Sequence, residues 1–330
     1  MHNQYHLFHE VGPFYETLWN LISKAKKSIS MLYLIYDQGV WADRLNEVLI
    51  PQALAGVKVR IMADYLGTIT DHPLNLINNL RMVEQLKSAG IEVTLFNPAG
   101  PRMSFLDRLH IKMCAIDENY LFLGGSNIGD YYLDWQDTNL LIDGTLGDIG
   151  HDLFDFVRSR SKDRPYSAVP EMDLPTSCIG DARVILTVPG SRRDIYRCIV
   201  SLVLNAHSPI YFRYWYFLPP KELLNALLSQ LENGLQLNIM VSNSTRVPII
   251  DLVNRIALRK LKLSGATIFR YKKRNMHSKI AWTEDGEIIL GSANIENRGL
   301  ANNFELCVGL HDPVLAEELS GNFWRDSQKE

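Results

Sequence analysis

Two stretches of the sequence, HIKMCAIDENYLFLGGSN (110–127) and HSKIAWTEDGEIILGSAN (277–294), carry one pattern at one spacing. In each, a His is followed by Lys two residues on, an acid seven on, Gly fourteen on and Asn seventeen on. The matching residues are His110, Lys112, Asp117, Gly124 and Asn127 in the first copy, and His277, Lys279, Glu284, Gly291 and Asn294 in the second. Matched offsets of this kind predict two similar halves, each with the same signature.

The segments that precede the two signatures repeat in the same order. NLISKAKKSISMLYLIY (20–36) parallels SLVLNAHSPIYFRYWYF (201–217), and AGVKVRIMAD (55–64) parallels NGLQLNIMVS (233–242). LKSAGIEVTLF (86–96) then parallels LKLSGATIFRY (261–271). The chain therefore divides into a first half at 1–165, a linker at 166–182 that holds Pro170 and Pro175, and a second half at 183–330.

Hydrophobic periodicity predicts alternating helices and strands within each half. In the first half, helical spacing covers 14–25, 41–55, 75–90 and 148–160, and strand patterns cover 29–36, 57–64, 91–96, 112–117, 120–125 and 137–144. This alternation predicts an α/β class protein with two α/β/α halves and mostly parallel sheets. We expect the halves to be related by a pseudo-two-fold axis, with the active site between them.

Composition narrows the class of protein. Among 330 residues, 46% are apolar and 22% are charged, as in soluble globular proteins. A net charge of -3 argues against nucleic acid as a partner. No stretch has the composition of a signal peptide or a membrane span, so we expect any membrane contact to be peripheral. Cys114, Cys178, Cys198 and Cys307 have no CxxC spacing, which favours free thiols in a reducing compartment.

The signatures favour chemistry on a phosphodiester. His and Lys two residues apart on a strand face the same side, so two copies supply two imidazoles, two ammonium groups and two Asn amides. One His can attack phosphorus while the other protonates the leaving oxygen and later deprotonates the incoming alcohol or water. Lys and Asn would stabilise charge on the non-bridging oxygens. We expect no metal and no cofactor.

Acids after each signature are candidates to orient the histidines. A nucleophilic imidazole needs an acceptor on its remote ring nitrogen. Asp137, in WQDTN, follows the first signature, and Glu305, in NFEL, follows the second. We expect them to serve one His each. Gly124, Gly125 and Gly291 fit strand ends where the backbone passes close to the site.

These motifs resemble the phospholipase D superfamily, whose signature is HxKxxxxD followed by GSxN. Within it, GGSNIGDYYLDWQDTNLLIDG (124–144) and GSANIENRGLANNFEL (291–306) are most similar to bacterial cardiolipin synthases, and the similarity extends from about Phe14 to Leu319. Two departures are Glu284, where the family has Asp, and Gly125, where Ser is common. The chain also resembles a shorter form, without the amino-terminal membrane spans of some such synthases.

The resemblance implies a phosphatidyltransferase that makes cardiolipin from two phosphatidylglycerols through a phosphohistidine. It implies His110 as the nucleophile, and a supporting role, away from the phosphorus, for the acid at Asp117 and Glu284. A hydrolytic phospholipase D or a phosphatidylserine synthase would use the same site with another acceptor. A phosphodiesterase or nuclease is disfavoured by the charge balance, and a non-catalytic scaffold by the intact signatures.

The implied partner is an anionic phospholipid in a membrane surface, at the cytoplasmic, inner face of the cell membrane. Cations that precede the histidines could meet the head groups: Arg102, Arg108, Lys272, Lys273 and Arg274. A solvated run of charges explains them equally well. The aromatic run 211–217 fits a buried strand better than an interfacial belt.

Overall fold

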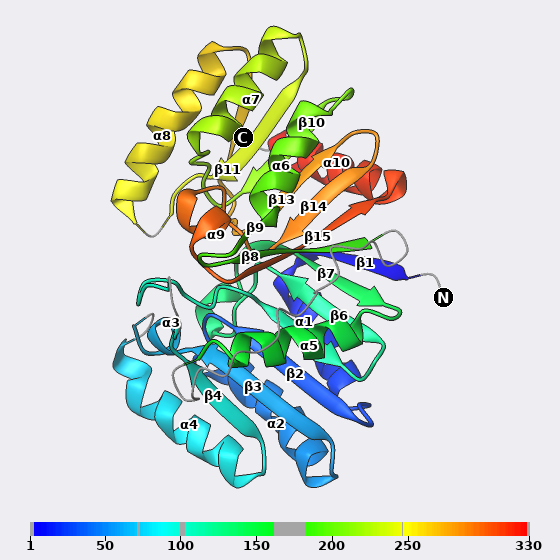
Figure 1. Ribbon diagram of the computed structural model, residues 1–330, viewed down its shortest axis with the longest axis vertical. Coiled ribbons are helices and arrows are strands. Elements are labelled where there is room, and N and C mark those ends of the chain that lie inside the picture. The colour runs from blue at the N-terminus through cyan, green and yellow to red at the C-terminus, as the bar shows by residue number, and fades with distance from the viewer. Residues whose placement is uncertain (1–2, 71–72, 100–102, 162–181, 246, 329–330) are drawn as a thin grey trace. The chain divides into compact units, whose positions relative to one another are not determined.

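The computed structural model describes residues 3–70, 73–99, 103–161, 182–245 and 247–328. The chain divides into two compact units (Figure 1). Unit 1 comprises Met1–Leu133 and Asn139–Thr176, and unit 2 comprises Asp134–Thr138 and Ser177–Glu330. The predicted linker at 166–182 lies outside the described residues except for Ala182.

Unit 1 is built on a seven-stranded sheet in the order β1-β7-β6-β5-β2-β3-β4. Its strands are β1 (Gln4–Glu10), β2 (Ser28–Tyr33), β3 (Lys58–Asp64), β4 (Glu92–Phe96), β5 (Met113–Ile116), β6 (Tyr120–Gly124) and β7 (Gln136–Asp143). Its helices are α1 (Val11–Ile22), α2 (Val40–Leu54), α3 (Tyr65–Thr70), α4 (Leu76–Ser88) and α5 (Gly147–Arg158). The predicted helices and strands of this half are present, and β1 and α3 are additions that the periodicity did not indicate.

Unit 2 is built on an eight-stranded sheet in the order β12-β11-β10-β13-β14-β15-β8-β9. Its strands are β8 (Ala182–Val188), β9 (Arg192–Arg193), β10 (Ile210–Tyr214), β11 (Leu237–Ser242), β12 (Thr267–Tyr271), β13 (Lys279–Thr283), β14 (Glu287–Gly291) and β15 (Glu305–His311). Its helices are α6 (Asp194–Leu204), α7 (Lys221–Glu232), α8 (Pro248–Leu263), α9 (Asn297–Ala301) and α10 (Pro313–Ser327). The strand order β4-β3-β2-β5-β6-β7 of unit 1 recurs as β12-β11-β10-β13-β14-β15.

Both sheets are mixed, which corrects the prediction of mostly parallel sheets. In unit 1, β2, β3 and β4 are parallel neighbours, whereas β5 pairs with β2 and β6 in antiparallel register, and β6 with β7. Unit 2 repeats this with β10, β11 and β12 parallel and β13, β14, β15 and β8 antiparallel. The reason is local: helical crossovers join the early strands, while the signature strands are joined by tight hairpins, which must be antiparallel.

Helices cover both faces of each sheet. In unit 2 the apolar side chains of α6, α7 and α8 pack with Phe212, Ile239 and Ala281 of the strands, whereas α10 contacts β12 and β14. Tyr211 and Trp282 stack on the α10 side, against Phe323. The aromatic run 211–217, including the cation Arg213, is buried except for the half-buried Trp215, which confirms its interpretation as core.

The start of β7 belongs to unit 2 although its sequence follows the first signature. Asp134–Thr138 groups with unit 2, and Asn139 onward groups with unit 1. The Gln136 N–H donates to the Asn275 carbonyl at 2.8 Å, and the His277 N–H donates to the Gln136 carbonyl at 2.8 Å. This pairing of distant segments brings the W-Q-D residues to the second signature.

Candidate active site

The two signature lysines are buried and held in the same way. Lys112 Nζ donates to the carbonyl oxygen of His110 at 2.7 Å, and Lys279 Nζ donates to that of His277 at 2.5 Å. Both lysines are almost fully enclosed, with exposed fractions of 2% and 1%. Each His-x-Lys segment therefore fixes its ammonium group beside its own histidine, one pair in each unit.

Each signature is anchored just before its histidine by the end of a strand that lies two places along the sheet. In unit 1, Asp64, at the end of β3, accepts from Leu109 N at 2.9 Å and is ion-paired with Arg108 at 2.8 Å. In unit 2, Ser242, at the end of β11, accepts from Met276 N at 3.3 Å. Arg108 is thus engaged within the protein, and Arg102, another cation considered for head groups, lies outside the described residues.

Asp137 orients the imidazole of His277. Its Oδ2 lies 3.0 Å from His277 Nδ1, and both side chains are buried, at 2% and 6% exposed. This contact makes Nδ1 the protonated nitrogen next to the carboxylate and leaves Nε2 for proton transfer. Asp137 follows the first signature in sequence, yet it serves the histidine of the second.

Two indole rings flank the same imidazole. The ring centroids of Trp135 and Trp215 lie 5.5 and 5.0 Å from that of His277, both edge-on. Aromatic edges packed on an imidazole limit its rotation and exclude water. Sequence reasoning did not assign a role in the site to either residue. Trp135 could have been predicted from the sequence, since it precedes Asp137 by two residues. The only signal for Trp215 was its position in a strand rich in aromatic residues.

Glu305 adds a second carboxylate to unit 2. It accepts from Ser292 Oγ at 2.5 Å and from Asn303 Nδ2 at 3.5 Å, and it is fully buried. Burial lowers the pKa of Lys279 to about 8, while the carboxylates of Asp137 and Glu305 act to raise it. Glu305 was predicted to orient a histidine, and its contacts within unit 2 include those with Ser292 and Asn303.

The signature glycines are required by close approach to the next strand. A Cβ at Gly124 would lie 2.2 Å from Asn139 Oδ1, and a Cβ at Gly291 would lie 2.2 Å from the Leu306 carbonyl. The signature asparagines, Asn127 and Asn294, are buried, and within the described part of the chain their Oδ1 atoms have no hydrogen-bond partner. Each asparagine thus has a buried acceptor oxygen without a partner, which costs free energy unless a ligand that donates a hydrogen bond completes it.

The signature acids lie at the far ends of β5 and β13 from the histidines. Asp117 accepts from the backbone N–H groups of Lys26, Lys27 and Ser28, at 3.0, 2.8 and 3.0 Å. Burial acts to raise the pKa of Asp117, but these backbone donors outweigh it, and the pKa is lowered. Asp117 is therefore an anchor for the loop before β2, in keeping with the supporting role that the resemblance implied.

In the second signature, two different residues correspond to Asp117: one matches its backbone hydrogen bond, and the other matches its side-chain contact with the loop. Asp117 N donates to Ser28 O at 2.8 Å, and Glu284 N donates to Pro209 O at 3.0 Å, so Glu284 matches Asp117 in register. The contact with the loop before β10 is made by Asp285, which accepts from Ser208 Oγ at 2.8 Å. Hydrogen bonding from Thr283, and then from Ser208, lowers the pKa of Asp285.

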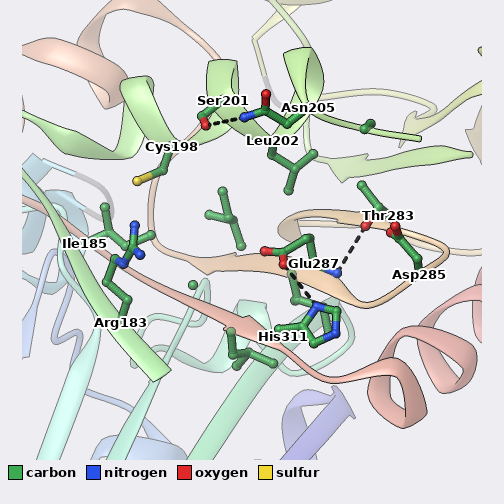
Figure 2. Close-up of a pocket in the computed structure, with 15 residues that line it drawn as sticks. Arg183, Ile185, Cys198, Ser201, Leu202, Asn205, Thr283, Asp285, Glu287 and His311 are labelled. Carbon is green, nitrogen blue, oxygen red and sulfur yellow. Dashed lines mark hydrogen bonds and ion pairs between the residues drawn. The ribbon is translucent and has the colours of Figure 1, made fainter. Parts of the chain in front are cut away.

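A cavity of about 510 Å³ lies at the same far end of β13 and β14 (Figure 2). Arg183, Cys198 and Asn205 are on its walls, and His311 contacts Glu287 at 3.0 Å beside it. Thr283 and Asp285, at the end of β13 away from His277, also line it. The cavity is therefore separate from the signature residues His277, Lys279 and Asn294.

The structure also bears on the cysteines, on metal ligands and on membrane spans. Cys114, Cys198 and Cys307 are free thiols, and Cys178 lies outside the described residues. Within the described ranges, no three His, Cys, Asp or Glu side chains are grouped so that they could hold a metal ion. Over the same residues, none of the helices is both long and apolar enough to cross a membrane.

Comparisons with known proteins find similar sequences over most of the chain. The family model described as "Cardiolipin synthase, PLD-like domain" matches twice, at residues 18–146 and 199–327. Cardiolipin synthase of Clostridium perfringens is 26% identical over 98% of this chain and 70% of its own length. The major cardiolipin synthase of Bacillus subtilis is 28% identical over 94% of this chain and 66% of its own length.

Solved structures agree on the fold. Phosphatidylserine synthase of Haemophilus influenzae superposes with a TM-score of 0.76 at 17% identity, over 98% of this chain and 86% of its own. Polyphosphate kinase of Porphyromonas gingivalis gives 0.64 at 16% identity, over 96% of this chain and 46% of its own. The two family matches cover most of the chain and each contains one signature. The chain therefore belongs to the cardiolipin synthase family with phospholipase D-like domains, which confirms the resemblance and places the protein among the enzymes of phosphodiester transfer.

Proposed function

We propose that this enzyme is a phosphatidyltransferase that makes cardiolipin from two molecules of phosphatidylglycerol and releases glycerol. The observation that carries the proposal is the buried Asp137–His277 pair, at 3.0 Å, beside the buried Lys279. An oriented imidazole next to a fixed cation suits proton transfer at a phosphodiester. The family match and the cardiolipin synthases among the relatives supply the substrate class.

In the first step, a ring nitrogen of His110 attacks the phosphorus of one phosphatidylglycerol. The bond from phosphorus to the head-group glycerol oxygen breaks, and that oxygen takes a proton from Nε2 of His277. Glycerol leaves, and the phosphatidyl group is held on His110. The Asp137 carboxylate stabilises the His277 imidazolium that donates the proton.

In the second step, a hydroxyl of a second phosphatidylglycerol gives its proton to His277 and attacks the same phosphorus. The phosphorus–nitrogen bond breaks, His110 is regenerated and cardiolipin is released. Lys112 and Lys279 offset the charge of the non-bridging oxygens. Asn127 and Asn294 would donate their amide NH₂ groups to the same oxygens.

We place the reaction at the inner face of the cell membrane, with the enzyme held peripherally. The substrate is an anionic lipid, so the enzyme must reach it in a bilayer. Neither a cofactor nor a metal enters these steps, since each proton transfer is assigned to His277 and each covalent bond to His110.

Purified protein incubated with phosphatidylglycerol vesicles tests the function, with cardiolipin and glycerol followed by mass spectrometry. We expect cardiolipin from the wild type, none from His110→Ala, and wild-type turnover from Glu284→Gln, which changes an exposed acid far from His277. In His277→Ala we expect the phosphatidyl group to accumulate on His110, detectable as an acid-labile adduct.

Three other outcomes would change the assigned reaction or the roles of the histidines. Phosphatidic acid in place of cardiolipin would make water the acceptor and the enzyme a hydrolase. Transfer to serine would make it a phosphatidylserine synthase. An adduct that accumulates in His110→Ala and not in His277→Ala would exchange the roles of the two histidines.

A further inference from the structure

Helix α8 of unit 2 carries two apolar stripes on opposite sides. Leu258 and Leu261, with Asn254, face the core. A second stripe faces solvent: Ile249, Leu252, Val253, Ile256 and Leu263, with exposed fractions of 62, 53, 44, 65 and 80%. At about 100° per residue these positions fall within roughly a third of the helix circumference. Figure 1 shows α8 at the outside of its unit, with α7 and β11 on its inner side.

Cations flank one side of this stripe. Arg255, Arg259 and Lys262 of α8, with Arg270 and Lys272 from β12 and the residue after it, line a groove of about 320 Å³ floored by Leu258 and Ile268. The acid in the helix, Asp251, is engaged at its N-terminal end, where it accepts from Thr245 N at 2.7 Å and Ser244 Oγ at 3.0 Å. In a chain with net charge -3, positive charge is therefore concentrated at this surface.

An exposed apolar stripe bordered by Lys and Arg is the composition of a helix that lies in the plane of a membrane interface. Anionic head groups attract the cations, and the apolar side chains enter the acyl boundary. A second copy of the chain fits poorly, because a two-fold interface on this surface would oppose one cation cluster to the other. A nucleic acid would use the cations and leave the apolar stripe in water.

The position of α8 links this surface to the active site. The helix follows β11, whose last residue, Ser242, accepts from Met276 N next to His277. The groove residues Arg270 and Lys272 lie at the start of the same segment that leads to His277. We propose that α8 and its basic groove form the surface by which the enzyme docks on an anionic phospholipid bilayer. This inference rests on the proposed function, since it supplies the membrane contact that the reaction needs.

Flotation with vesicles tests the docking surface directly. The two test proteins are Leu252→Gln/Ile256→Gln and Arg259→Gln/Lys262→Gln. The matched controls are Val314→Gln, which is 75% exposed on α10, and Arg197→Gln/Lys221→Gln, on α6 and α7. The vesicles are equimolar phosphatidylglycerol and phosphatidylcholine, or phosphatidylcholine alone.

We expect the wild type and both controls to float with anionic vesicles and to remain behind with neutral ones. Each test variant should lose at least about tenfold in vesicle affinity, and the charge variant should show a weaker dependence on salt. Circular dichroism and light scattering should show the same fold and the same mass in all five proteins.

Test variants that float as the wild type does would overturn the docking surface. So would a change in mass on Leu252→Gln/Ile256→Gln, which would assign the stripe to a second copy of the chain. Transfer on short-chain phosphatidylglycerol, dissolved as monomers, separates the two proposals. Test variants that keep this turnover while losing vesicles support docking; a wild type that floats but transfers nothing retains docking and refutes the phosphatidyltransferase.

Discussion

At the residue scale, the Asp137 carboxylate acts on the pKa of Lys279, which sequence spacing does not reveal. Lys279 is buried beneath His277, and its pKa is lowered to about 8 by burial, against the pull of Asp137 and Glu305. The ammonium group is therefore close to losing its proton under mildly alkaline conditions. The same carboxylate that orients His277 also helps to keep Lys279 charged.

The transfer rate should fall as pH rises through about 8, because Lys279 then loses the charge that offsets the phosphate. Asp137→Asn should lower kcat by about 10²–10⁴-fold through loss of imidazole orientation, and should move the alkaline limb to lower pH by removing a charge that raises the lysine pKa. Initial rates from pH 6 to 9.5 measure both, with the exposed Asp134→Asn as the control. A wild-type rate that stays flat to pH 9 would contradict this assignment.

At the scale of elements, the β5–β6 and β13–β14 hairpins are tied to the loops before β2 and β10 by acids. Asp117 collects three backbone N–H groups, and Asp285 is bonded to Ser208. Both acids have a lowered pKa, so their contribution to stability is present above the ordinary aspartate pKa and is lost as pH falls through the folded-state value.

Asp117→Asn should lower the free energy of unfolding at pH 7 by about 1–2 kcal/mol, because it weakens hydrogen bonds to a charged acceptor. Asp285→Asn should act in the same direction, and Glu284→Gln should have no effect, since its exposed side chain does not make the loop contact. Urea titrations at pH 7 and pH 3 check this, with the difference between Asp117→Asn and wild type expected to shrink at pH 3. An equal loss of unfolding free energy in Glu284→Gln and Asp285→Asn would contradict the assignment of the stabilising loop contact to Asp285 alone.

At the scale of the whole molecule, the two units share β7. Its first residues pair with the second signature, while the strand from Asn139 onward lies in the sheet of unit 1. A segment fixed to both units at once couples their unfolding through the chain itself. We therefore expect one cooperative transition in the wild type.

Gln136→Pro should disturb that coupling. It removes the N–H that donates to Asn275, together with the side-chain oxygen that accepts from Ser278 Oγ. Thermal unfolding followed by calorimetry should then resolve two transitions, and transfer activity should fall because Asp137 is displaced from His277. Gln136→Ala, which keeps the backbone donor, is the control. A single unshifted transition in Gln136→Pro would show that this pairing does not couple the units.

Much of this protein could be read from the sequence, because its determinants are local and duplicated. The spacing of His, Lys, Gly and Asn identified the signatures, and hydrophobic periodicity located the helices and strands of the first half. The close contacts of Gly124 and Gly291 explain why the signature admits no side chain there. Family membership followed from the same residues, over most of the chain.

The tertiary structure decided which residues far apart in sequence meet. It paired Asp137 with His277, brought two indole rings to the same imidazole, and gave the loop contact of the second copy to Asp285 instead of Glu284. It also made the sheets mixed, and exposed the second stripe of α8. Periodicity reports which face of one element is apolar; strand order and the path of the chain between elements determine what that face, or a side chain at its end, contacts.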